Sequence, residues 1–148
     1  MSKIKVNTRD IKRLQQSLEL LRDKEVDRLM RASVRALAAE FIRSVKKRTP
    51  VGKHPPNSGK RGGTLRRGWN LRNLHKTEDG YEIEIYNDIE YASFVEHGHM
   101  TRSSPDGPPP RWVEGRHMLK NTGTEITFRV EEILEKELLK FLDKLKLG

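Results

Sequence analysis

The stretch that decides the fold is residues 25–50, EVDRLMRASVRALAAEFIRSVKKRTP. Its apolar residues recur at spacings of three and four, which predicts a long amphipathic helix over about 24–48. The Thr49–Pro50 pair ends this helix, because a residue before proline avoids the α conformation. We expect the rest of the chain to pack around it.

Further helices are predicted on both sides of this stretch. One covers 9–22, with Asn7 or Thr8 in place to cap it. The other covers 124–146, where TGTE at 122–125 resembles a capping box. The apolar positions of the first are Ile11, Leu14, Leu18 and Leu21.

Between the helices the sequence indicates strands and two long loops. YEIEIYND at 81–88 alternates apolar and polar residues, and with the segment from Leu65 it predicts an antiparallel hairpin. Residues 49–64 and 98–111 are rich in Gly and Pro and are expected to be loops. The predicted class is α+β, a small antiparallel sheet packed by a long helix, with amphipathic N-terminal and C-terminal helices and two long loops. We expect one domain over 1–148: N-terminal helices 9–48, basic loop 49–64, sheet region 65–119 and C-terminal helix 124–146.

Length and composition narrow the class of protein. The 148-residue chain is long enough to bury a single core. It has no cysteine, which excludes disulfides, thiolate zinc sites and a cysteine nucleophile. The N-terminus lacks a signal-peptide pattern and no run of 18 apolar residues occurs, so we expect a protein kept inside a cell, with no membrane partner.

Charge is unevenly distributed along the chain. Residues 1–76 hold 21 Lys and Arg against 6 Asp and Glu, whereas residues 77–148 hold 9 against 15. Residues 41–77 hold 11 basic residues and no acidic one. Such a segment suits a nucleic acid or an acidic protein surface, and the alternative is a solvated basic face. The opposite charges of the two halves also suit head-to-tail contact between copies.

The histidines are the first candidates for chemistry. His97 and His99 lie two positions apart, and His117 with Glu96 or Glu114 would complete a three-ligand zinc site. A structural role is favoured over metal binding, because no helical HExxH motif is present and the surrounding loop has no fixed geometry.

No other enzyme signature is found. The loop serines have no GxSxG elbow, and GKRGGT at 59–64 lacks the spacing of a phosphate-binding loop. We therefore expect no catalytic residue, no metal and no cofactor; a hydrolase that uses the histidines is the remaining enzymatic alternative.

The basic segment is a candidate nucleic-acid site. Trp69 is placed to stack a base, although a core or interface anchor is favoured for it. No recognition helix or zinc knuckle is present, so such a contact would be independent of base sequence. The candidate contacts to DNA or to an acidic partner are Lys46, Lys47, Arg48, Lys53, Lys60 and Arg61.

Two stretches resemble the signature of a known family. TPVGKHPPNSGKRGGTLRRGW (49–69) is similar to TPVdTGrLrrSw, and YASFVEHGHMTRSSPDGPPPRWVEGRHML (91–119) is similar to YAxyVEfGhrTr…WVxGrhML, of small phage neck proteins. These are called tail-completion, head-tail joining or minor tail proteins. In this chain the VDTG turn is expanded to VGKHPPNSGKRGG, and the loop before Trp112 is proline-rich. The matching residues are Pro50, Val51, Leu65, Arg66, Arg67, Trp69, Tyr91, Val95, Glu96, Gly98, Arg102, Trp112, Gly115 and Arg116.

The resemblance implies a non-enzymatic subunit of a ring, with an expected copy number of six, at the head-proximal end of a tail. Such a ring completes the tail and joins it to the head connector, in the neck of a virion or phage-tail-like particle assembled in the bacterial cytoplasm. The implied partners are further copies, tail-tube or tail-terminator proteins, head-connector proteins and DNA that passes through the lumen. The alternative is a nucleic-acid-binding module that uses the basic segment 41–77.

From the residues of the second motif we expect a turn and a contact surface. Gly98 is expected to take a positive φ, and Tyr91, Phe94 and Val95 are expected to pack on the sheet. Polar groups nearby are expected to pair with the next subunit. Both long loops are expected to order against neighbours on assembly.

Overall fold

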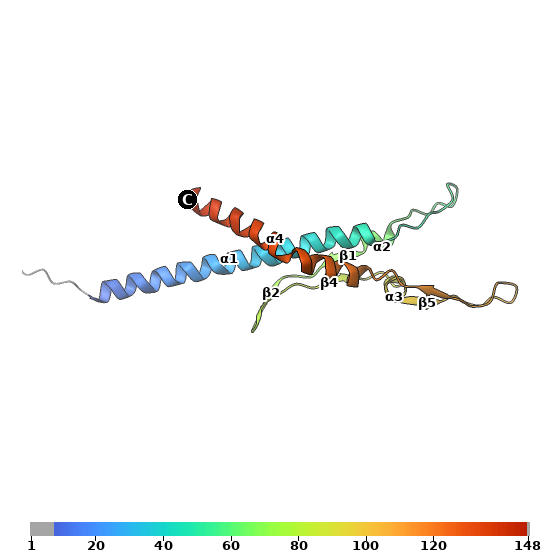
Figure 1. The fold of residues 1–148 in the computed structure, drawn as a ribbon, viewed down its shortest axis with the longest axis horizontal. Coiled ribbons are helices and arrows are strands. Elements are labelled where there is room, and N and C mark those ends of the chain that lie inside the picture. Colours follow the sequence, from blue (N-terminus) through green and yellow to red (C-terminus); the bar gives the residue numbers. More distant parts are fainter. Residues whose placement is uncertain (1–7, 148) are drawn as a thin grey trace, which may run out of the picture.

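The computed structural model describes residues 8–147 and shows an elongated molecule built on one long helix (Figure 1). This helix, α1, has 41 residues, from Thr8 to Arg48. The prediction of separate helices over 9–22 and 24–48 is wrong, because RDKE at 22–25 contains neither Gly nor Pro and these residues tolerate a helix. Thr8 is the first helical residue, and Asn7 lies outside the described residues.

The C-terminal helix α4 spans Met118–Leu147 and packs along the C-terminal part of α1 before the two diverge (Figure 1). It begins earlier than the predicted residue 124, so the expected capping box is wrong. Thr122 lies within α4 and is fully buried. Thr124 donates its hydroxyl to the carbonyl of Lys120 one turn back, which is a helix-interior contact.

The segment between these helices folds into short elements. Two of them are helical, α2 (Thr64–Arg67) and α3 (Ala92–His97). The strands form three antiparallel ladders: β1 (Trp69–Leu71) with β4 (Ile85–Asn87), β2 (His75–Thr77) with β3 (Gly80–Glu82), and β5 (Gly98–Met100) with β6 (Trp112–Glu114). The α+β class and the hairpin are confirmed, and the small sheet takes the form of separate ladders.

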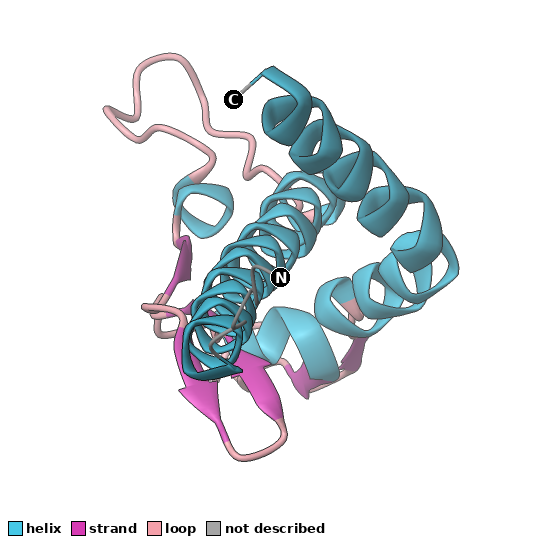
Figure 2. Cartoon of the chain, turned by 90° about the vertical axis from the view of Figure 1, so that its left-hand side faces the viewer, coloured by secondary structure: helices cyan, strands magenta, loops and turns pink. Residues whose placement is uncertain are grey.

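The core lies where these elements meet α1. Figure 2 shows α4 on one side of α1 and strands on another, so α1 is covered from two directions. The central cluster takes one residue from each of four elements: Val45, Leu65, Trp69 and Met118. This cluster fixes the C-terminal part of α1 and leaves its N-terminal part uncovered, since residues 15–24 are all exposed.

Two long loops project from the end of the molecule opposite the N-terminal part of α1 (Figure 1). They follow α1 and β5, and residues 51–61 and 102–111 are exposed throughout. Both loop predictions are confirmed, with the second loop starting after β5 rather than at Gly98. Within residues 8–147, no helix carries a stretch long and apolar enough to cross a bilayer.

Candidate functional site

Glu96 joins α3 to the start of α4. Its side chain is only 6% exposed, and its carboxylate accepts hydrogen bonds from the backbone N–H groups of Leu119, at 3.0 and 3.2 Å, and Lys120, at 3.3 Å. Helix N-termini leave such N–H groups unpaired, and a negative charge there also favours the helix dipole. Glu96, one of the residues that match the family signature, therefore has its carboxylate engaged within its own chain.

Backbone hydrogen bonds complete this connection, which we call the α3–α4 junction. Arg116 N–H donates to the carbonyl of Val95 at 2.7 Å, and His117 N–H donates to the carbonyl of Glu96 at 3.1 Å. His117 takes a positive φ of 48° as the chain turns into α4. The GRH run of the second motif thus binds the end of the VEHG run.

Two glycines allow the backbones at the junction to come close. Gly98 has φ 88°, which confirms the expected positive φ. A Cβ at Gly98 would lie 2.6 Å from both the Trp112 ring and the carbonyl oxygen of Val113. A Cβ at Gly115 would lie 2.4 Å from the carbonyl oxygen of Glu96. Any larger residue at either glycine would push the two segments apart.

Trp69 is a core residue rather than a free base-stacking platform. It is 4% exposed, and its Nε1–H donates to the hydroxyl of Thr49 at 2.7 Å. Thr49 in turn donates to the carbonyl of Val45 at 2.6 Å, at the C-terminal end of α1. Arg66 donates to the carbonyl of Thr49 at 3.1 Å. The first motif therefore ties α2 and β1 to the end of the long helix.

An apolar surface remains exposed beside the junction. Phe94, Met100 and Trp112 are each more than half exposed, and a hollow of about 460 Å³ is lined by Phe94, His99, Met100, Thr101 and Arg102. The expectation that Tyr91 and Phe94 pack on the sheet is wrong. Tyr91 and Phe94 are 45% and 54% exposed, whereas Ala92 and Val95 pack against the core.

The three histidines do not assemble a metal site. Within residues 8–147, no group of three or more His, Asp or Glu side chains is placed to hold a metal ion. His97 and His117 are exposed, whereas His99 is half-buried with its ring centroid 5.9 Å from that of Phe94. Nδ1 of His99 is buried and has no hydrogen-bond partner within the described chain.

The basic residues divide into two groups. Arg48 pairs with Glu125, and Arg67 donates to the carbonyl of Gly62 at 3.1 Å, so these two serve the fold. The others lie toward the loop end: Lys46, half-buried, and the exposed Lys47, Lys53, Lys60 and Arg61. Within the described residues none of these five makes an ion pair, and their charge remains available to a partner.

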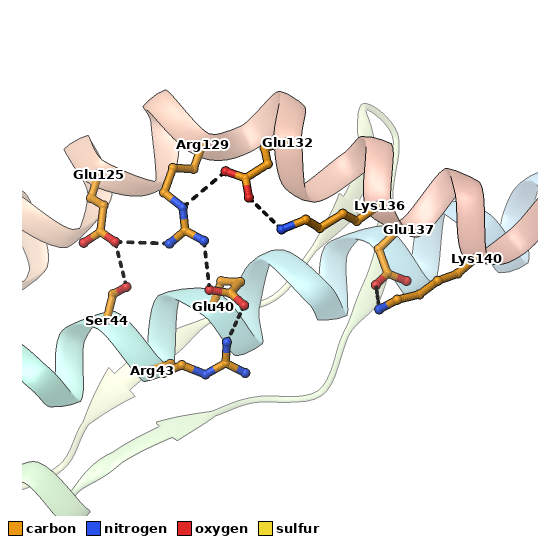
Figure 3. Close-up of polar contacts among 9 residues, drawn as sticks. All are labelled: Glu40, Arg43, Ser44, Glu125, Arg129, Glu132, Lys136, Glu137 and Lys140. Atoms are coloured by element: carbon orange, nitrogen blue, oxygen red, sulfur yellow. Dashed lines mark hydrogen bonds and ion pairs between the residues drawn. The ribbon is translucent and has the colours of Figure 1, made fainter.

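A set of ion pairs that sequence patterns did not reveal holds α4 on α1 (Figure 3). Arg129 donates to Glu125 at 3.2 Å and to Glu40 of α1 at 3.4 Å, and Ser44 of α1 donates to Glu125 at 3.0 Å. The hydrogen bonds from Arg48 and Ser44 hold the pKa of Glu125 below its usual value of 4.5. No local signal marks the contacts between the two helices, since Ser44 and Glu125 lie 81 positions apart.

A second tie missed by sequence patterns fixes the β2–β3 hairpin to α1. The Tyr81 hydroxyl donates to Asp27, which also pairs with Arg31 at 2.8 Å, and the Arg31 guanidinium lies 5.3 Å from the centre of the Tyr81 ring. The hydrogen bond from Tyr81, followed by that from Arg31, lowers the pKa of Asp27. The alternating segment at 81–85 therefore contributes a hydrogen bond to α1, through the hydroxyl of Tyr81, as well as an apolar face.

These residues define a structural α+β protein whose signature side chains join elements to one another. A family model described as "Bacteriophage HK97-gp10, putative tail-component" matches residues 12–98, more than half of the 148-residue chain. The chain belongs to this family of phage tail components. Neither the comparison with curated proteins nor the comparison with solved structures gives a match. The family match ends at Gly98, so residues 99–119 of the second motif lie beyond it.

Proposed function

We propose that this chain is a non-enzymatic subunit of a ring at the head-proximal end of the tail, which completes the tail and joins it to the head connector. The observation that carries the proposal is the match to the tail-component family over residues 12–98. The motif residues support it, because Glu96, Gly98 and Trp69 hold the scaffold and bring no reactive groups together.

The shape of the molecule supports contact through its loop end. Residues 51–61 and 102–111 are exposed along their whole length and lie at the same end of the molecule (Figure 1). Long exposed loops are commonly binding elements. The apolar surface of Phe94, Met100 and Trp112 lies beside the second loop. In the proposed ring, loops and surface order against the next subunit and the connector.

A second candidate function is a nucleic-acid-binding module, which the exposed Lys53, Lys60 and Arg61 favour. In the ring these same residues would face DNA in the lumen or an acidic surface of the connector. Part of the basic segment is already neutralised, since Arg43 pairs with Glu40, Arg48 with Glu125 and Arg72 with Glu84.

The deciding experiment is the mass of the purified protein in solution, alone and mixed with tail-tube and connector proteins, alongside a duplex-DNA titration at low and moderate salt. A ring, or a monomer that joins a ring with its tail partners, supports the joining role. A monomer that ignores those partners and binds DNA tightly, with affinity that falls steeply as salt rises, supports the second candidate and overturns the first.

A further inference from the structure

The N-terminal part of α1, residues 12–24, carries an apolar stripe that the rest of the described chain does not cover. Leu18 and Leu21 are 56% and 57% exposed and lie three positions apart, on one face of the helix. We call these two residues the α1 stripe. In the sequence, Ile11 and Leu14 extend the same spacing toward the N-terminus.

The α1 stripe lies on the face of α1 that α4 covers further along. Ala36 and Ala39 line the groove between the two helices together with Ile133 of α4. They follow Leu18 and Leu21 by 18 residues, which make about five full turns. Because α4 diverges from α1 beyond their crossing (Figure 1), this helix-binding face continues without a partner helix.

The C-terminal half of α4 has an uncovered stripe of its own. Leu138 and Leu145 are 42% and 50% exposed, and we call them the α4 stripe. With Leu134 and Phe141 they repeat at spacings of four, three and four. In α1, Ile11, Leu14, Leu18 and Leu21 also alternate spacings of three and four. This pattern is typical of two helices that pack along a narrow seam.

Charge favours contact between the two different stripes over contact between like ones. Residues 12–24 of α1 hold four basic and two acidic side chains, whereas residues 131–145 of α4 hold five acidic and three basic ones. Two α1 segments, or two α4 segments, would bring like net charges together. An α1 segment against an α4 segment brings opposite net charges together.

We infer that the α1 stripe of one copy packs on the α4 stripe of the next copy of this chain. The contact is heterologous, so each added copy leaves one free stripe of each kind, and assembly continues until a ring closes. This inference rests on the proposed ring and names the surface that joins its subunits.

The test uses two double variants of the full chain, L18E/L21E and L138E/L145E, under the condition in which the native chain oligomerises, alone or with its tail partners. Each should weaken self-association by more than about a hundredfold, because two leucines are lost from the seam. Mixed in equal amounts, they should form a dimer and nothing larger, since the pair holds one intact stripe of each kind. Mass is measured by sedimentation equilibrium.

Matched controls distinguish the loss of a stripe from the general effect of placing a charge at any exposed apolar residue. Leu20 is 64% exposed but lies on the opposite face of α1 from Leu18, so L20E should assemble like the native chain. Phe128 on α4, outside the stripe and 85% exposed, gives F128E as the second control. Helix content by circular dichroism should be equal in all variants, since every replaced side chain is exposed.

The outcomes distinguish this interface from the ring itself. If L18E/L21E assembles as the native chain does, the ring stands and its subunits join elsewhere, which overturns the inference. If only one double variant fails to self-associate, the contact joins two like stripes, and the inference also fails. A native chain that stays monomeric alone and with tail partners overturns both the ring and this interface.

Discussion

At the scale of single residues, Glu96 connects two helices that are separate in the sequence. It lies at the end of α3, yet its buried carboxylate caps the N-terminus of α4, 23 and 24 positions further on. Without it, the N–H groups of Leu119 and Lys120 would lose their acceptor at a partly buried site. Unpaired donors of this kind are costly because they give up water without gaining a partner.

We therefore expect E96A to lower the free energy of unfolding by about 1–3 kcal/mol. E96Q keeps one acceptor oxygen and should fall between E96A and the native chain. Urea unfolding followed by circular dichroism measures both. The control is E114A on β6, where Glu114 is exposed and makes no ion pair within the described residues. Equal losses for E96A and E114A would contradict a capping role.

Two glycines give a second prediction at the residue scale, because replacing them by alanine should change the stability of the fold in opposite directions. G98A should destabilise the fold by about 1–3 kcal/mol, because it places a Cβ at positive φ and against Trp112 and Val113. G123A should stabilise it by about 0.5–1 kcal/mol, because Gly123 lies inside α4 with open space at its Cβ position. Thermal unfolding of both variants tests the contrast, and a stabilising G98A would contradict the close approach.

At the scale of elements, the crossing of α1 and α4 depends on charged groups as well as on apolar packing. The lowered pKa of Glu125 makes the stability of this crossing sensitive to acid. The unfolded chain binds a proton on this carboxyl at a higher pH than the folded chain does. The contribution of Glu125 is therefore present above its usual value of 4.5 and is lost as the pH falls through its lowered value.

The expected result is that E125Q reduces the loss of thermal stability between about pH 6 and about pH 3. At pH 6 the variant should melt below the native chain, and the two melting temperatures should converge in acid. E131Q is the control, since Glu131 is an exposed α4 residue without an ion pair in the described part of the chain. An equal pH dependence for E125Q and the native chain would show that other carboxylates dominate.

Local patterns predicted those elements whose signals lie within them. The apolar spacing of α1 and its end at Thr49–Pro50 are local, as is the positive φ of Gly98. The signal for the start of α4 is not local, because its cap comes from Glu96, and TGTE lies inside the helix rather than at its boundary. Exposure of Phe94 was also missed, since a six-residue helix offers too short a period to show which face is buried.

For the candidate site, the sequence indicated which residues matter but not which of them contact one another. The motif comparison selected Glu96, Gly98 and Gly115, but which atoms meet depends on how α3 lies against the start of α4. The ion pair of Arg129 with Glu40 has no local pattern, since Glu40 lies on α1, 89 positions away, whereas Glu125 lies four positions from Arg129 within α4.

At the scale of the whole molecule, the apolar core occupies the middle and both ends project from it (Figure 1). Trypsin should cut the isolated subunit first in the loops, after Lys53, Lys60, Arg61 or Arg102, because these residues are exposed and lie outside helices and strands. In the assembled particle the same cuts should slow by at least about tenfold, as the loops order against neighbours. Mass spectrometry of timed digests measures both rates, and equal rates would contradict ordering on assembly.

The length of α1 also separates the two ends of the subunit widely enough for each to be labelled and located. Its 41 residues rise by about 1.5 Å each, so the helix alone spans about 60 Å, and the two loops project beyond its far end. A gold label near Thr8 and an antibody fragment bound to residues 102–111 would therefore be resolved as separate points, even in low-resolution electron micrographs. Their order along the particle axis would give the polarity of the subunit within the tail without an atomic map.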